Sequence, residues 1–240
     1  MDTLSSTPNL TRDEFTQVVL EAAPKVAAFD CDGTLWSGDA GETFFRWEIE
    51  SGVVSAELGR AMYARYAEYK AGKVSEDDMC GEMVTMHKGM SDTFMLQAAT
   101  EFMEKHFPGK VFPEMLDLVH TLHQRGCEIW AVSSSNEWLI RAGMRQFGIV
   151  ADRVLAAKVE VDGDRVTDRM VRIPSGPGKP QALREMAKKN IGAAFGNSRW
   201  DVDMLEMATR AFAVNPNPDL ETVARQRGWS IYFPDGTRRG

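Results

Sequence analysis

Short apolar segments that run directly into chemically active residues are the feature that most constrains this fold. The three such junctions lie at residues 25–29 before Asp30, at residues 129–132 before Ser133, and at residues 193–195 before the segment 196–201. Residues 25–29 are apolar without alternation, which is typical of a parallel strand buried on both faces. Ligands of open α/β sheets bind where the carboxyl ends of such strands converge. The pattern therefore predicts a site at one sheet edge.

Strands alternate with helices over most of the chain, which favours a Rossmann-like, doubly wound parallel sheet of the α/β class. The capping box of Thr11 and Glu14 predicts a first helix to about Ala23. Helices are expected over 114–124, 137–146, 179–189 and 200–208. An Asp-Gly pair within residues 159–166 predicts a hairpin that projects from the edge of the core.

Residues 38–106 read as helical throughout, with no strand between them. We interpret this stretch as a small helical cap inserted into the sheet domain. The chain is thus divided into a catalytic core of residues 1–37 and 107–240 and a cap of residues 38–106.

The amino-acid composition argues against some classes of binding partner and location. A net charge of -7 argues against a nucleic-acid-binding protein, which usually carries a basic face. Three cysteines, without metal-like spacing, indicate reduced thiols and a cytoplasmic location. Residues 1–9 are polar, and no apolar run approaches the roughly 18 residues of a transmembrane helix. We expect no export signal and no membrane association; the sequence leaves the oligomeric state open.

Four motifs occur in a fixed order: FDCDGTL at 29–35, VS at 132–133, Lys179 after Gly-Pro-Gly, and GNSRWD at 196–201. Together they resemble the motif set of the haloacid dehalogenase superfamily, mainly phosphatases that form an aspartyl-phosphate intermediate. The helical insertion after the first motif is similar to that of the phosphoserine-phosphatase-like branch. The resemblance implies a phosphatase acting on a small phosphorylated metabolite.

The first motif supplies the expected catalytic carboxylates. Two aspartates one residue apart at a strand end can splay, so that one attacks and the other transfers a proton. We assign Asp30 as nucleophile and Asp32 as general acid and base. Gly33 allows a sharp backbone turn, and Gly33 and Thr34 are expected at the substrate. A surface Asp-x-Asp-Gly turn is the alternative reading.

The second and third motifs supply expected partners of the phosphoryl group. The resemblance implies that Ser133 binds a phosphoryl oxygen, with Ser134 as the competing residue and a substrate contact. A helix cap is the alternative for these serines. Lys179 would offset negative charge on the phosphoryl group and Asp30. Lys158 competes with it, but a solvated lysine is the simpler interpretation there.

The fourth motif departs from the family pattern, because Asn197 stands where an aspartate normally helps to hold Mg²⁺. An amide oxygen can coordinate a hard cation, but the site loses one negative charge. We expect metal contacts from Asp30, the main-chain carbonyl of Asp32, Asn197 and Asp201. Asp201 has two other possible roles: it could hold Lys179, or it could be a helix N-terminal carboxylate.

Residues near the cap entrance bear on substrate choice. The resemblance implies that Asp39 or Glu42 binds a substrate amine, whereas residues 75–103 contain no arginine for a substrate carboxylate. The sequence therefore makes phosphoserine a less favoured candidate for the substrate. The aromatic and acidic residues expected at the entrance are Trp36, Asp39, Glu42, Phe44, Phe45, Trp47, Tyr63 and Glu82. They suit a cationic headgroup, as in phosphocholine or phosphoethanolamine. For at least two of Phe44, Phe45 and Trp47, however, packing in the core of the cap is the preferred interpretation.

The leading hypothesis is a Mg²⁺-dependent phosphomonoesterase. A dehalogenase also uses a carboxylate nucleophile, but halide needs no proton from Asp32. A phosphometabolite-binding protein with weakened catalysis is the third hypothesis, and it rests on Asn197.

Overall fold

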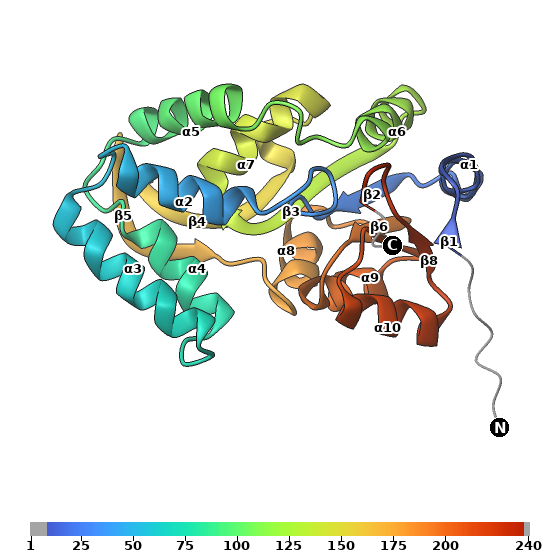
Figure 1. Ribbon diagram of the computed structural model, residues 1–240. Coiled ribbons are helices and arrows are strands. Elements are labelled where there is room, and N and C mark those ends of the chain that lie inside the picture. The colour runs from blue at the N-terminus through green and yellow to red at the C-terminus, as the bar shows by residue number, and fades with distance from the viewer. Residues whose placement is uncertain (1–8, 238–240) are drawn as a thin grey trace.

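The sheet orders the whole molecule. The computed structural model describes residues 9–237, which fold around one eight-stranded sheet in the order β1-β8-β7-β6-β2-β3-β4-β5 (Figure 1). All neighbouring strands are parallel except β4 and β5, which form an antiparallel hairpin at one edge. The predicted α/β class is confirmed. The strands are β1 Asn9–Leu10, β2 Val26–Phe29, β3 Glu128–Asn136, β4 Val154–Asp162, β5 Arg165–Arg172, β6 Ala193–Gly196, β7 Arg210–Val214 and β8 Ser230–Tyr232.

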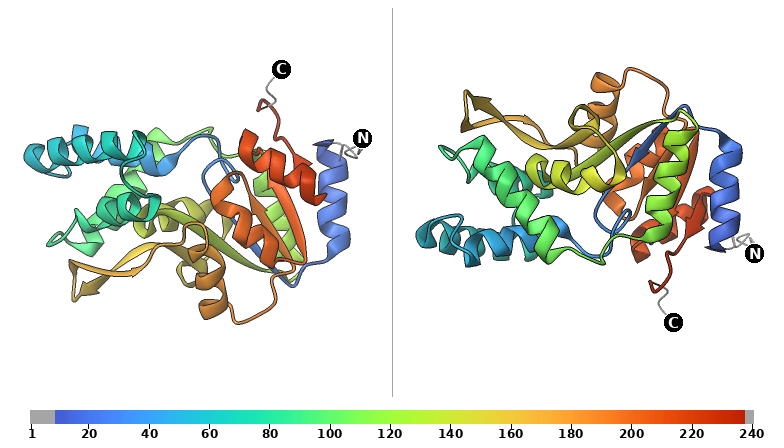
Figure 2. Two further views of the ribbon diagram at one scale, coloured as in Figure 1. Left: turned by 90° about the horizontal axis from the view of Figure 1, so that it is seen from below. Right: turned by 90° about the horizontal axis from the view of Figure 1, so that it is seen from above.

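Helices cover both faces of this sheet (Figure 2). Apolar residues of α1, α6 and α7 pack on one face, and those of α8, α9 and α10 pack on the other. The α-helices within residues 9–237 are α1 Arg12–Ala22, α2 Ala40–Glu50, α3 Ala56–Lys70, α4 Glu76–Thr85, α5 Asp92–His106, α6 Pro113–Gln124, α7 Glu137–Met144, α8 Gly178–Met186, α9 Val202–Met207 and α10 Pro218–Arg227. Each of these helices is too short or too polar to span a lipid bilayer.

Strand β2 lies at the centre of the sheet, and this position explains its unbroken apolar sequence. Ala27 and Phe29 face the α1 and α6 side, whereas Val26 and Ala28 face the α8 and α9 side. Phe29 is in register with a residue of β3 on one side and of β6 on the other. The first, second and fourth motifs therefore lie together at the carboxyl ends of these neighbouring parallel strands.

The helical segment between β2 and α6 is joined to the sheet through a shared core. Helix α2 contributes Phe44, and α5 contributes Phe102, to the apolar cluster that covers one sheet face. A smaller cluster around Phe45 and Met79 holds α2, α3 and α4 together. Each of the four helices begins at a side chain that caps a free amide: Asp39, Ser55, Ser75 and Ser91. The division into core and cap remains a prediction.

The hairpin is present at the edge of the sheet, as predicted. Strand β4 also pairs with β3, and the hairpin tip contacts the helical segment. Asp164 accepts a hydrogen bond from Ser91 Oγ (2.6 Å) and one from the main-chain N of Thr93 (2.9 Å). Figures 1 and 2 show the hairpin at the end of the molecule opposite β1, and it lies beside α4 and the start of α5. Lys158, expected to be solvated, pairs with Glu137 at 2.8 Å.

Other differences are local. The capping box of Thr11 and Glu14 is present, as predicted. Helix α8 ends at Met186 rather than at residue 189, and Lys188 has a positive φ of 51° that is incompatible with helix. The helix expected over 200–208 is split into a 3₁₀ turn, Arg199–Asp201, and α9. The two-residue strand β1 was not expected. The polar terminus discussed above falls largely on residues 1–8, outside the described residues.

We predict that α5 and the sheet unfold together. Phe102 is 1% exposed, and its ring lies 5.1 Å from that of Phe44, so Phe102→Ala should lower the free energy of unfolding by about 3–5 kcal/mol. Denaturant titration followed by circular dichroism and by tryptophan fluorescence should give one transition. The control is Phe94→Ala, which removes a 45% exposed ring and should change stability by less than about 0.5 kcal/mol. A separate early transition would contradict the shared core.

Candidate active site

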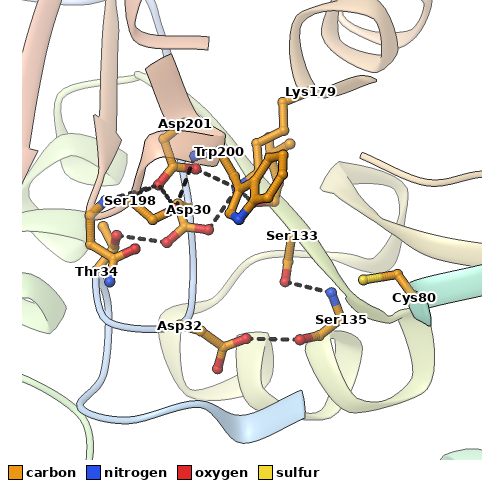
Figure 3. Close-up of polar contacts among 12 residues, drawn as sticks. Asp30, Asp32, Thr34, Cys80, Ser133, Ser135, Lys179, Ser198, Trp200 and Asp201 are labelled. Atoms are coloured by element: carbon orange, nitrogen blue, oxygen red, sulfur yellow. Dashed lines mark hydrogen bonds and ion pairs between the residues drawn. The ribbon is translucent and has the colours of Figure 1, made fainter. Parts of the chain in front are cut away.

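Residues of all four motifs meet where the central strands end (Figure 3). Asp30 directly follows β2, and its main-chain N donates to the carbonyl of Phe195 in β6 (2.9 Å). Ser133 lies within β3, and Lys179 lies in the first turn of α8. The structure therefore brings together residues that are far apart in the chain, such as Lys179 and Asp30, which are separated by 149 positions.

A buried ammonium group joins two buried carboxylates. Lys179 Nζ lies 2.7 Å from Asp30 Oδ1 and 2.5 Å from Asp201 Oδ1, and it also donates to the carbonyl of Val132 (3.3 Å). Lys179 is 2% exposed, Asp30 6% and Asp201 0%. Burial lowers the pKa of Lys179, but the charges of Asp201 and Asp30 outweigh it, so the pKa is raised and the lysine stays charged. This group of three carries one net negative charge when both carboxylates are ionised.

Asp201 is oriented by its own motif. Its Oδ2 accepts hydrogen bonds from the main-chain N atoms of Asn197 and Ser198, both at 2.9 Å. A Cβ atom at Gly196 would lie 2.5 Å from Asp201 Cβ, which explains why a glycine precedes Asn197. Both carboxylate oxygens of Asp201 thus already have protein partners. Of the roles considered for Asp201, the structure shows two: it contacts Lys179, and it is a helix N-terminal carboxylate that completes a capping box with Ser198.

The second oxygen of Asp30 accepts a hydrogen bond from Thr34 Oγ1 at 2.7 Å. Burial and the nearby charge of Asp201 raise the pKa of Asp30 to about 6, against the lowering effects of Lys179 and Thr34. Asp30 is therefore held in one orientation by one cationic and one neutral donor. Thr34 contacts the proposed nucleophile and is fully buried.

Asp32 has a different set of hydrogen-bond donors, all of them neutral. Oδ1 accepts from Trp36 Nε1 (2.8 Å) and from the main-chain N of Ala40 (2.6 Å), and Oδ2 accepts from Ser135 Oγ (2.8 Å). Burial, followed by the charge of Asp39, raises the pKa of Asp32 to about 7, although Trp36 and Ala40 lower it. A carboxyl group that titrates near neutral pH suits proton transfer.

The serines of the second motif lie apart from the helix cap. The residue that caps α7 is Asn136, whose Oδ1 accepts from the main-chain N of Leu139 at 2.8 Å. Ser133 is 2% exposed, and its Oγ accepts from the main-chain N of Ser135 (3.1 Å), so its own hydrogen remains available to donate. Ser134 instead lines a cavity below the helical segment.

The donor set beside Asp30 fits a divalent cation. Gly33 has φ 79°, and a Cβ atom there would lie 1.8 Å from Asn197 Nδ2, so the Asn197 amide lies directly against the first motif. Among residues 9–237, no side chain makes a hydrogen bond to that amide. No three His, Cys, Asp or Glu side chains within this range form a metal-binding group. A cation would need the Asn197 amide and the main-chain carbonyl of Asp32 beside Asp30.

A cavity of about 80 Å³ lies between the second motif, at Ser134 and Ser135, and the helices α2, α3 and α4. Its polar lining comprises Asp39, Glu42, Tyr66, Tyr69, Lys70, Glu76, Cys80, Ser134, Ser135 and Asn136. The sequence indicated Asp39 and Glu42 but missed Tyr66, Tyr69 and Lys70. Their spacing on one face of a helix was the available signal. A larger, more open groove of about 580 Å³ lies between α1 and α6 and contains none of the motif residues.

Several aromatic residues expected at the entrance belong to the apolar core. Trp36, Phe44 and Phe45 are all 0% exposed, which supports the packing interpretation for them. Glu82 pairs with Arg65 at 2.8 Å and does not line the cavity. Glu42 is also engaged: it lies 2.8 Å from Arg46 and 3.2 Å from Lys70, and it accepts from Tyr66 Oη (2.6 Å).

Comparison with known proteins identifies the family. The family model of haloacid dehalogenase-like hydrolases matches residues 27–206, and the chain belongs to this family. A histidinol-phosphatase of Neisseria meningitidis is 26% identical, and the match covers 86% of this chain and 97% of that protein. A phosphoserine phosphatase of Mycobacterium tuberculosis is 26% identical, with 69% of its length and 85% of this chain covered. A structure of unknown function from Bordetella pertussis has a TM-score of 0.77 at 23% identity, covering 86% of this chain and 97% of that one. The resemblance inferred from the four motifs is confirmed.

We predict that ionised Asp32 destabilises the metal-free protein. A carboxyl group whose pKa is higher in the folded than in the unfolded state stabilises the fold below its unfolded pKa, and this contribution is lost as pH rises through the folded value. For Asp32 that interval runs from 3.8 to about 7. With EDTA present, Asp32→Asn should be more stable than wild type by roughly 1–2 kcal/mol at about pH 8, and equal to it near pH 4.

Urea titrations across that pH range would measure the difference. Asp152→Asn, at an exposed aspartate, is the matched control and should show no such pH-dependent gain. A constant difference between Asp32→Asn and wild type at all pH values would contradict the prediction.

Proposed function

We propose that the protein is a Mg²⁺-dependent phosphomonoesterase that hydrolyses a small phosphorylated metabolite through an aspartyl-phosphate on Asp30. The observation that carries this proposal is the contrast between the two neighbouring aspartates. Asp30 is paired with a buried ammonium group, whereas Asp32 contacts neutral donors alone. The curated relatives named as phosphatases support the same chemistry.

The reaction divides into two displacements at phosphorus. First, a carboxylate oxygen of Asp30 bonds to phosphorus while the ester P–O bond breaks, and Asp32 gives its proton to the leaving alcohol oxygen. Then a water oxygen attacks the acyl phosphate and Asp32 takes the water's proton. The bond between phosphorus and Asp30 breaks, and inorganic phosphate is released. Lys179 stays beside Asp30 while negative charge moves, and Ser133 has a hydroxyl hydrogen available for a phosphoryl oxygen.

Asp30, the main-chain carbonyl of Asp32 and Asn197 are the groups that would hold Mg²⁺. The bound cation would neutralise charge on the phosphoryl oxygens and balance the excess negative charge of the Asp30, Lys179 and Asp201 group. Gly33 keeps the main chain of the first motif close enough to Asn197 for such a shared site.

The cavity favours a substrate with a cationic group. Three carboxylates line it, from Asp39, Glu42 and Glu76, against one ammonium group from Lys70. Lys70 and Arg46 already neutralise Glu42, whereas Asp39 makes no ion pair with any residue in the range 9–237. An amine beside Asp39 would therefore gain a charged partner.

We propose a phosphate ester of an amino alcohol as the substrate class, such as phosphoethanolamine, phosphocholine or histidinol phosphate. Such esters lack the carboxylate that would need a cation, and no arginine lines the cavity. A histidinol-phosphatase among the relatives fits this class. We further propose a cytoplasmic enzyme, in keeping with the three free thiols, and no nucleic-acid or membrane partner.

The first experiment is a screen of amino-alcohol phosphates, phosphoserine and 4-nitrophenyl phosphate, each with and without Mg²⁺. We predict that Asp30→Asn lowers kcat by at least about 10³-fold, because no other side chain can form the acyl phosphate. Circular dichroism should show that the fold is retained. A variant with a near-normal rate would exclude Asp30 as nucleophile. Turnover of a haloacid, but of no phosphate ester, would indicate a dehalogenase; binding without turnover would indicate a phosphometabolite-binding protein.

We also predict that Asn197→Asp binds Mg²⁺ roughly tenfold more tightly, because it adds a negative charge to a hard-cation site without changing side-chain size. Calorimetric titration of the protein with MgCl₂ measures this independently of turnover. Asn190→Asp changes an exposed amide of similar chemistry far from the motifs and should leave the affinity unchanged. An unchanged titration for Asn197→Asp would argue against coordination at this position.

A further inference from the structure

The two carboxylate oxygens of Asp32 have hydrogen-bond partners of different kinds. Oδ1 accepts from an indole N–H, that of Trp36, and from the main-chain N–H of Ala40. These groups can only donate, so a proton on Oδ1 would face two other protons. Oδ2 contacts the Ser135 hydroxyl at 2.8 Å, and a hydroxyl can either donate or accept. The proton that Asp32 gives and takes therefore belongs on Oδ2.

Ser135 stands between this oxygen and the cavity. Its side chain points toward Asp32 in Figure 3, and the residue also lines the cavity where the alcohol part of a substrate would lie. The main-chain N of Ser135 donates to Ser133 Oγ (3.1 Å), which fixes the backbone at this point. A leaving-group oxygen that enters from the cavity therefore reaches Asp32 Oδ2 beside Ser135.

The position of the Ser135 hydroxyl depends on a glycine in the first turn of α2. A Cβ atom at Gly41 would lie 2.3 Å from Ser135 Oγ, closer than any tolerated contact. Gly41 is helical and has no positive φ, so its backbone conformation does not require glycine. Space for the Ser135 hydroxyl is the physical reason for glycine here.

We propose that Ser135 is a positioning residue for proton transfer, which holds Oδ2 of Asp32 toward the leaving oxygen. Its hydroxyl group can occupy this position only because residue 41 is a glycine. This inference rests on the proposed function. When the ester P–O bond breaks, the proton passes from Oδ2 to the alcohol oxygen, and the Ser135 hydroxyl then donates to the carboxylate left behind. In the second displacement, Oδ2 takes a proton from water, and the Ser135 hydroxyl oxygen then accepts a hydrogen bond from the protonated carboxyl group.

The test compares two phosphate esters of similar shape, benzyl phosphate and 4-nitrophenyl phosphate. Benzyl alkoxide is a poor leaving group that needs a proton, whereas 4-nitrophenolate leaves without one. The ratio kcat/KM reports the steps up to alcohol release, which separates proton donation from the later hydrolysis. Ser135→Ala should lower kcat/KM for benzyl phosphate by about tenfold or more, and for 4-nitrophenyl phosphate by at most about twofold.

A second variant disturbs the same Ser135 hydroxyl by adding a methyl group next to it. Gly41→Ala should displace Ser135 Oγ and produce the same selective loss, and alanine is also the better helix former. In the double variant, Gly41→Ala should add little, because the atom with which it collides is gone. Equal losses for both esters, no loss, or a selective effect of Gly41→Ala that persists without the Ser135 hydroxyl would overturn the proposal.

Matched controls come from the same region. Ser37→Ala removes a hydroxyl that donates to the carbonyl of Lys110, and Gly81→Ala adds a methyl group that meets the flexible end of Ile173 at 3.2 Å. Neither should change the ratio between the two esters. A wild-type protein that hydrolyses neither ester with Mg²⁺ would overturn the proposed function and this inference with it. Hydrolysis of both esters with an unselective Ser135→Ala would overturn the inference alone.

Discussion

The buried contact between Lys179 and the carboxylates of Asp30 and Asp201 is the constraint on which the site depends. One ammonium group cannot neutralise two carboxylates, and removing Lys179 would leave both of them buried without a cation in a nearly water-free position. The three residues come from the end of β2, the start of α8 and the turn after β6, so their contact fixes how these elements meet. The charge that remains unbalanced explains why the site suits a divalent cation beside Asp30.

The two aspartates of the first motif differ because of what surrounds them. The oxygens of Asp30 accept hydrogen bonds from an ammonium and a hydroxyl group, which hold the carboxylate in one orientation, as the proposed attack at phosphorus requires. Asp32 lies among an indole, an amide and a hydroxyl group, and burial without a cationic partner raises its pKa to about 7. Two carboxyl groups of identical chemistry thereby suit two different tasks at one pH.

The helical segment packs over the site and supplies most of the polar lining of the cavity. Aromatic side chains expected at the entrance, such as Phe44 and Phe45, are instead buried among apolar neighbours. Tyr66 and Tyr69 take the positions facing the cavity, each donating to a carboxylate. The cavity is consequently small and lined by three carboxylates, those of Asp39, Glu42 and Glu76.

The sequence by itself determined the class of fold, the order of the elements and the family. These features depend on near neighbours in the chain: apolar runs that fit buried strands, the capping box of Thr11 and Glu14, and an Asp-Gly turn in the hairpin. It also indicated Asp30, Asp32, Ser133 and Lys179 through their positions at the expected strand and helix ends. Only the tertiary structure decided which partners these residues have. The contact of Ser135 with Asp32 spans 103 positions, so no local pattern could reveal it. That of Lys179 with Asp30 spans 149 positions and was expected only from the resemblance to a known family. Whether an aromatic residue lines a cavity or fills a core depends likewise on the elements packed against it, because periodicity gives the buried face of a helix but not what covers it.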